Sequence, residues 1–295
     1  MGHVATPYLL LVPTIIAIVA LLGYPIVNLV ELSFQQYGLG QLITHHGVYI
    51  GLANYSSILS DPLFWNTLWR TLVFTAANVG LTMVLGMLIA LLLVRVSTWV
   101  RLLLTGALVL AWSMPPVVAV QVWNWMTNLQ NGVLNYTLTQ LGIGNYFQHN
   151  WYASTASQYA MVTSLIVWGG LPFVVITVYA SLSQVPHELV EAAQIDGARA
   201  WRILKDVTLP VVKPILLILT SLSIIWDFGV FTQPYLLIGP GQQSPDNYLM
   251  STYLYIEGYA QTDYGKGAAI SILMLAIVAV LSIFYVRAML RTGDE

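Results

Sequence analysis

The residues with the most chemical potential in this chain form one polar stretch, EAAQIDGARAWRILKDVTLP, which runs from Glu191 to Pro210. Three of the ten basic residues of the chain lie inside it, and strongly apolar segments flank it on both sides. In a chain with only 7% charged residues, such a stretch needs a reason to exist. We interpret it as a surface that binds a partner in the aqueous phase.

Motifs for catalysis and for metal binding are missing from the sequence. A nucleotide-binding GxxxxGK[ST] loop does not occur, because Tyr264-Gly265-Lys266-Gly267 lacks both the earlier glycine and the Ser/Thr. GxSxG and HExxH patterns do not occur either. His45-His46 is the only histidine pair, and no carboxylate stands at metal-binding spacing from it. The sequence therefore predicts a protein that is not an enzyme and that holds no catalytic residue, cofactor or metal.

Asp227 is the second residue with chemical potential, since it lies near the middle of an apolar segment long enough to cross a membrane. A carboxylate at that depth is costly and marks a functional site by default. Two roles stay open for it. It could contact a transported substrate, or it could make a structural bond to a helix end or to a neighbouring chain.

Composition sets the environment in which these residues must be positioned. Of the 295 residues, 58% are hydrophobic and 7% are charged, and the mean hydropathy is +0.75. Soluble domains carry charge on roughly a quarter of their residues, so this chain is predicted to be an integral membrane protein. The net charge is -2, so the chain lacks the excess of basic residues that is typical of nucleic-acid binding. The absence of cysteine excludes disulfides.

Six apolar segments are long enough to cross a hydrocarbon core of about 30 Å, which needs about 20 helical residues. Backbone groups in lipid must bond within their own segment, so the fold is predicted to be all-α, with a single transmembrane domain over residues 1–295. The first segment is too long for a signal peptide and is expected to be retained. The six segments are 8–34, 67–94, 101–126, 158–183, 214–238 and 267–290.

The basic residues are divided unevenly between the two sides of the membrane. Eight of the ten fall on one side, and only Arg70 and Lys266 fall on the other, which places the larger set in the cytoplasm. With an even number of spans, both termini are then expected to be cytoplasmic, as is the 184–213 loop that contains the polar stretch. The eight residues are Arg95, Arg101, Arg199, Arg202, Lys205, Lys213, Arg287 and Arg291.

Helix breakers interrupt two of the predicted spans near mid-membrane. Pro115-Pro116 falls in the third span and Gly169-Gly170-Leu171-Pro172 in the fourth. Proline removes a helical hydrogen bond, and broken helices at this depth often line a transport pathway. Glycine and proline are also frequent in membrane helices in general, so both explanations stay open.

Helix rules predict a helix–turn–helix inside the 184–213 loop. Pro186 suits the first turn of a helix, and Gly197 stands where a left-handed C-terminal cap is expected. A second short helix is predicted over 198–207, ending before Leu209-Pro210. Small residues around the glycine would let another protein approach closely. An amphipathic helix that lies on the membrane surface would fit part of this pattern.

The same stretch resembles the EAA loop of bacterial ABC-importer permeases. Glu191-Ala192-Ala193, then Gly197, then Val207-Thr208-Leu209-Pro210 match that loop, and the match is most similar to the carbohydrate-uptake branch, the maltose/glycerol-phosphate permease-like family. Gly51-Leu52-Ala53-Asn54-Tyr55 and Trp226-Asp227 resemble further segments of these permeases, so the resemblance covers nearly the whole chain.

This resemblance implies a six-helix permease of MetI-like architecture, which moves a sugar from an extracytoplasmic binding protein or lipoprotein into the cytoplasm by alternating access. It implies a multi-pass protein of the bacterial or archaeal inner membrane, in contact with lipid and not with nucleic acid. The other expected partners are a second homologous permease subunit and a cytoplasmic ATPase dimer that carries ATP and Mg. The residues expected to couple the loop to the ATPase are Glu191, Ala192, Ala193, Asp196, Gly197, Leu209 and Pro210.

The resemblance also implies a substrate path along the helices that flank the loop. Positional transfer from a related maltose-type permease points to Gly170, Phe173, Ile225, Trp226 and Gly229. Asp227 and Trp168 complete the predicted path, since a tryptophan ring can pack on the apolar face of a sugar. Gln121 and Asn124 could supply hydrogen bonds. Aromatic residues in membrane helices more often serve packing, so that alternative stays open.

Two other classes of protein compete with this interpretation. A stand-alone secondary transporter or channel for a small polar solute would carry coupling carboxylates or inverted repeats, and only Asp227 stands out. A membrane-embedded enzyme would need clustered polar catalytic groups in or beside its spans, and the sequence has no such cluster.

Overall fold

The computed structural model describes the backbone of residues 5–293 and the side chains of residues 10–287. Within that part the chain is helical except for loops and two strands of two residues each, which confirms the all-α prediction. In chain order the elements are α1 (Ala5–Ile18), η1 (Val19–Gly23), α2 (Tyr24–Ser33), β1 (Gln35–Gln36), α3 (Leu39–Thr44), β2 (Val48–Tyr49), α4 (Ala53–Ser60), α5 (Pro62–Arg95), α6 (Thr98–Trp112), α7 (Pro116–Met126), α8 (Val133–Gln140), α9 (Thr155–Leu182), α10 (His187–Ile195), α11 (Ala200–Ile203), η2 (Leu204–Thr208), α12 (Leu209–Phe228), α13 (Thr232–Ile238), η3 (Pro240–Gln242), α14 (Met250–Leu254), η4 (Tyr255–Ala260) and α15 (Tyr264–Gly293).

The described residues contain six membrane spans if one bent helix pair is counted as a single span. The bent pair is α6 and α7, which meet at an angle of 101° around Pro115. Proline cannot continue the helical hydrogen-bond ladder, so the predicted break in the third span is confirmed. The sides of the membrane on which the loops lie stay a prediction, and the side chain of Arg291 lies outside the described residues. The five single spans are Leu10–Ser33, Pro62–Arg95, Thr155–Leu182, Ala200–Phe228 and Tyr264–Arg287.

The chain forms two compact units, each described here by itself. Unit 1 comprises Met1–Asn66 with Thr252–Ile277, and unit 2 comprises Thr67–Ser251 with Val278–Glu295. A single domain over residues 1–295 stays a prediction. Unit 2 contains both the 184–213 loop and most of the spans, so it positions every candidate site residue.

Side-chain bonds hold the loops of unit 1. The amide of Asn54 donates to the backbone oxygens of Ser33 and Gln35, at 3.0 and 2.9 Å. The ammonium of Lys266 lies 2.6 Å from the carboxylate of Glu257, and both side chains are largely buried. A buried ion pair with good geometry fixes the turn between η4 and α15.

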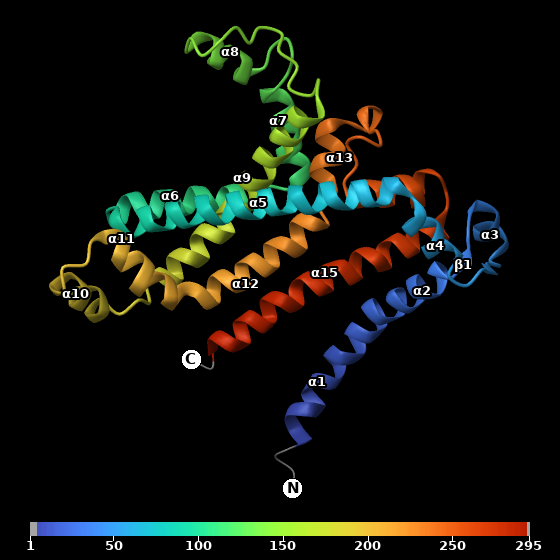
Figure 1. Cartoon of the computed structure of the whole chain (residues 1–295), viewed down its shortest axis with the longest axis horizontal. Coiled ribbons are helices and arrows are strands. Elements are labelled where there is room, and N and C mark those ends of the chain that lie inside the picture. Colours follow the sequence, from blue (N-terminus) through green and yellow to red (C-terminus); the bar gives the residue numbers. More distant parts are fainter. Residues whose placement is uncertain (1–4, 294–295) are drawn as a thin grey trace. The chain divides into compact units, whose positions relative to one another are not determined.

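The long helix α9 forms the centre of unit 2. One apolar cluster packs its first half against α5, α7 and α13 around Val162, Leu165 and Ile166. A second cluster packs its last half against α5 and α12 around Val174 and Val178. Figure 1 shows α8 and the α10–α11 loop at opposite ends of this unit. The helix α9 therefore links the two ends.

The predicted break in the fourth span is wrong, because α9 continues through Gly169-Gly170-Leu171-Pro172. Pro172 removes only the hydrogen bond that would reach the carbonyl of Trp168. The residues that follow, Val174 and Val175, are buried in unit 2, and this packing keeps the next turn in register. A proline in a buried helix therefore costs one bond without ending the helix.

Two further predicted boundaries are wrong. The helix α12 ends at Phe228, and α13 is separate, so Asp227 lies at the end of a helix and not near the middle of a span. The short helix predicted over 198–207 does not stop before Leu209-Pro210, because α11 passes through η2 into α12. The backbone N–H of Leu209 bonds to the carbonyl of Leu204, a π-type turn. This wider turn carries the helix past Pro210, which has no N–H to donate.

Close packing of α5 on α9 gives a stability prediction at Gly86. A Cβ added there would lie 2.5 Å from a methyl carbon of Val174, so Gly86→Ala is expected to destabilise the chain by about 1–3 kcal/mol. The matched control is Gly80→Ala on the same helix, where nothing lies within 4 Å and alanine is the better helix former. Thermal unfolding in detergent should show a lower midpoint for Gly86→Ala only. Equal midpoints for the two variants would contradict the packing.

Candidate substrate path and coupling loop

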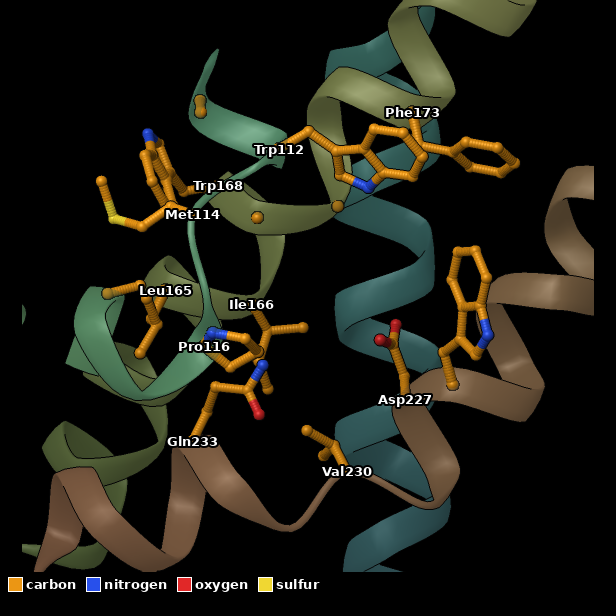
Figure 2. A pocket seen from close by; sticks show the side chains of 15 residues that line it. Trp112, Met114, Pro116, Leu165, Ile166, Trp168, Phe173, Asp227, Val230 and Gln233 are labelled. Atoms are coloured by element: carbon orange, nitrogen blue, oxygen red, sulfur yellow. The ribbon is translucent and has the colours of Figure 1, made fainter. Parts of the chain in front are cut away.

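A cavity of about 370 Å³ opens in unit 2 beside the bend between α6 and α7. The end of α6, the start of α7, the middle of α9 and the α12–α13 connection all contribute to its wall. Figure 2 shows its labelled side chains around one shared space. Its lining residues are Ala111, Trp112, Met114, Pro116, Ala119, Leu165, Ile166, Trp168, Gly169, Gly170, Phe173, Trp226, Asp227, Val230 and Gln233.

Aromatic rings form one wall of the cavity. The rings of Trp112 and Phe173 stack with centroids 5.8 Å apart, and Phe173 also contacts Trp226 at 5.4 Å. On the other side Trp168 packs against Trp123 at 5.1 Å. The Trp123 indole donates a 2.9 Å hydrogen bond to the Ser164 hydroxyl, which fixes that pair. Flat apolar faces held in this way can stack on the C–H faces of a sugar ring.

Apart from the indole N–H groups of its tryptophans, the cavity has two polar side chains, and both come from the α12–α13 region. The Asp227 carboxylate and the Gln233 amide extend into the same space in Figure 2. Among the residues that the structure describes, Asp227 has no hydrogen bond or ion pair, and no lysine or arginine lines the cavity. A carboxylate accepts hydrogen bonds, and an amide both donates and accepts them. The arrangement can therefore bind hydroxyl groups.

The structure brings together five of the seven residues predicted for the substrate path. Trp168, Gly170, Phe173, Trp226 and Asp227 all line the cavity.

The other two path residues and both predicted hydrogen-bonding residues do not line it. The side chain of Ile225 is 41% exposed, and Gly229 is the C-cap of α12. Gln121 and Asn124 on α7 are also outside the cavity. Successive helical residues point about 100° apart, so the turn that directs Trp226 and Asp227 into the cavity directs Ile225 away.

The lining residues that come from the helix breaks were not predicted from the sequence. Trp112, Met114 and Pro116 flank the bend at Pro115, so the proline pair was the signal that could have found them. Val230 and Gln233 lie at the break after α12, where the sequence had been predicted to continue as one helix. Gly229 directly after α12 and Pro234 in the first turn of α13 were the local signals that could have placed that break.

The predicted cap within residues 184–213, named the coupling loop after its predicted role, is confirmed in detail. The helix α10 begins directly after Pro186 and carries Glu188 in its first turn. Gly197 has φ +75°, and its N–H bonds to the carbonyl of Gln194 at 3.0 Å. The N–H of Ala198 reaches the carbonyl of Ala193 at 2.9 Å. These two bonds form a Schellman motif, which requires a left-handed residue and favours glycine.

Apolar side chains are exposed on the coupling loop. Ile195 is 87% exposed and Trp201 is 72% exposed, one on each side of the Gly197 turn. The predicted coupling residues Glu191, Ala192 and Asp196 are also exposed.

Ala193 is half-buried, and Leu209 packs against the apolar cluster of α9 and α12. Leu209 therefore contributes to the core of unit 2, while the α10 face and the turn form the accessible part of the loop.

A second, polar cavity of about 460 Å³ lies in unit 1. It is bounded by α2, which contributes Glu31, and by the segment from β1 to β2, which contributes His45 and His46. Among the residues that the structure describes, no group of His, Cys, Asp and Glu could hold a metal ion.

Comparison with known proteins places this architecture among permeases. The model of the family described as "Binding-protein-dependent transport system inner membrane component" matches residues 82–291. The chain is 43% identical to the diacetylchitobiose uptake system permease protein DasB of Streptomyces coelicolor, over 98% of this chain and 88% of the relative. It is 33% identical to the inner membrane ABC transporter permease protein YcjO of Escherichia coli, over 92% of this chain and 89% of the relative.

A solved structure has the same fold. The chain superposes with a TM-score of 0.81 on a chain of a bacterial ABC transporter involved in the import of the acidic polysaccharide alginate. The two are 22% identical, and the match covers 96% of this chain and 94% of that chain. At this identity the likeness concerns the fold alone.

Proposed function

This chain belongs to the family of binding-protein-dependent transport system inner membrane components, and we propose that its cargo is an uncharged mono-, di- or oligosaccharide. The chain is a transmembrane permease subunit of an ABC importer. The observation that carries the proposed cargo is the cavity beside the α6–α7 bend. Its aromatic wall suits the C–H faces of sugar rings, and Asp227 and Gln233 suit hydroxyl groups. The 43% identical relative is a permease for diacetylchitobiose, which supports the same cargo class.

The coupling loop is proposed to dock on a cytoplasmic ATPase dimer that holds ATP and Mg. Exposed Ile195 and Trp201 offer an apolar anchor on each side of a rigid turn, and apolar anchors of this kind dominate binding energy at interfaces. Glu191, Ala192, Ala193, Asp196 and Gly197 form the proposed contact face, with Leu209 and Pro210 joining it to α12.

A second homologous permease subunit is proposed to complete the pore, and an extracytoplasmic binding protein is proposed to deliver the sugar. Both termini are proposed to lie in the cytoplasm, by the distribution of basic residues.

Reconstitution tests this proposal. The chain, its homologous permease subunit and the ATPase are placed in vesicles with the binding protein, and uptake of radiolabelled diacetylchitobiose, maltose and a uronic-acid disaccharide is compared. Uptake of a neutral sugar that requires ATP is expected. Uptake by this chain alone on a proton or sodium gradient would favour the stand-alone transporter instead. Uptake of only the uronic-acid disaccharide would refute the proposed cargo.

Phe173→Ala tests the aromatic wall. Loss of its ring contacts is expected to raise the KM for diacetylchitobiose by about twofold to tenfold, since a ring contact contributes about 0.5–1.5 kcal/mol. Phe147→Ala is the matched control, because that ring is exposed and does not line the cavity. An unchanged KM in Phe173→Ala, with the complex intact, would remove Phe173 from the path.

A further inference from the structure

Arg101, in the first turn of α6, bonds to the end of a different helix. Its Nε donates to the backbone oxygen of Leu93 at 3.0 Å, and its Nη2 donates to that of Val96 at 3.1 Å. The last four carbonyls of a helix have no partner within the helix. The helix α5 ends at Arg95, so Leu93 carries one of these carbonyls and Val96 directly follows the helix. The guanidinium therefore caps α5 with two charge-assisted bonds, which are stronger than bonds between neutral groups.

The same guanidinium also contacts α9. It lies 5.5 Å from the ring centroid of Tyr179, within the range of a cation–π interaction. Tyr179 belongs to the last turn of α9, and its carbonyl accepts bonds from the N–H and the hydroxyl of Ser183. Only residues 183–186 separate that turn from α10. One side chain thus joins α5, α6 and the helix end that leads into the coupling loop.

This junction is one of the contacts that hold α6 along α9, where the two helices pack side by side. No residue of α6 is buried, and the apolar cluster that joins α5, α9 and α12 contains no α6 side chain. At its other end α6 carries Trp112, which stacks on Phe173 and lines the cavity. A helix is stiff along its axis, so movement imposed at Arg101 reaches Trp112.

We propose that Arg101 is a positioning residue for coupling: its guanidinium holds α6 to Tyr179, so that movement of the coupling loop reaches the cavity wall at Trp112. This inference rests on the proposed function. A lysine could not replace the arginine, because a single ammonium cannot reach two carbonyls and a ring in the same fixed geometry.

The test measures ATP hydrolysed per diacetylchitobiose imported by the reconstituted complex. Arg101→Gln and Tyr179→Leu are each expected to raise this ratio by about threefold to tenfold. The double variant is expected to be no worse than Arg101→Gln, because both remove the same junction. Tyr179→Phe keeps the ring and is expected to keep the ratio. Arg95→Gln is the matched control, since Arg95 is exposed at the same end of α5 and makes no bond in the described structure.

Two outcomes would overturn the proposal. Uptake and hydrolysis could fall together with the ratio unchanged, which would make Arg101 a cap with no role in coupling. The effects of Arg101→Gln and Tyr179→Leu on the ratio could also multiply in the double variant, which would show that the two residues act independently. If the unaltered complex shows no ATP-dependent uptake, the proposed function itself fails, and the role of Arg101 fails with it.

Discussion

Gly197→Arg is expected to lower diacetylchitobiose uptake by about tenfold or more, while ATP hydrolysis by the complex continues. Gly197 has φ +75°, and nothing lies within 4 Å of the position that its Cβ would occupy. An arginine side chain would therefore project into the open space beside α10, where the ATPase is proposed to dock. Uptake and phosphate release are measured on the same vesicles, so that uncoupling is separated from loss of protein.

The matched control is Gly142→Arg, at the end of α8. Gly142 has φ +69°, open space around its Cβ position and the same Schellman bonds, from Gly142 to Thr139 and from Ile143 to Leu138. Both substitutions therefore impose a similar backbone cost, about 1–2 kcal/mol for a left-handed non-glycine residue. In Figure 1, α8 lies far from α10 within unit 2. Equal loss of uptake in both variants would assign the effect to strain and contradict the docking role.

Local rules were sufficient to predict α10 and its cap. Pro186 and Gly197 act through φ restriction and a left-handed turn, and each depends only on residues nearby in the sequence. The structure places Gly197 as predicted, whereas Pro186 is the N-cap, one residue before the first turn of α10. The six apolar segments were predictable for a similar reason, because span length follows from bilayer thickness.

Breaks at proline could not be predicted by the same rules. Pro115 separates two helices by 101°, whereas Pro172 lies inside an unbroken helix and Pro210 follows a π-turn. The difference lies in what packs around each proline. Pro172 is buried among core residues of α9, while Pro115 is exposed and directly precedes α7, which begins at Pro116. Tertiary packing decides such cases, and a single sequence does not contain it.

The cavity was predictable only in part for the same reason. Asp227 was found because a charged residue stands out in an apolar segment, and Trp226 was found through the resemblance to a maltose-type permease. Gln233 and Met114 do not stand out, and they reach the cavity only because α12 ends at Phe228 and α6 ends at Trp112. A residue at a helix break joins a site through backbone direction, which composition does not encode.

Asp227→Ala is expected to lower uptake of diacetylchitobiose by about tenfold to a hundredfold without loss of complex assembly. Asp227 is the only carboxylate on the described cavity wall, and it has no bond within the described residues. Its oxygens are therefore available to substrate hydroxyl groups. Loss of a hydrogen bond to a charged group costs about 1.5–3 kcal/mol, which corresponds to that range. Asp227→Asn keeps the shape and one acceptor oxygen, so its loss is expected to be smaller.

Assembly and uptake together separate the two roles that the sequence left open for Asp227. Asp246→Ala is the control, since Asp246 is an exposed carboxylate of the same unit and does not line the cavity. If size-exclusion chromatography shows that Asp227→Ala no longer assembles, the carboxylate bonds to another chain and its role is structural. If the complex assembles and takes up sugar normally, the carboxylate bonds neither to the sugar nor to another chain. Asp227 lies on the substrate path only if the Asp227→Ala complex assembles but takes up less sugar. A carboxylate that bonds only to the sugar can be removed without any effect on the contacts between subunits.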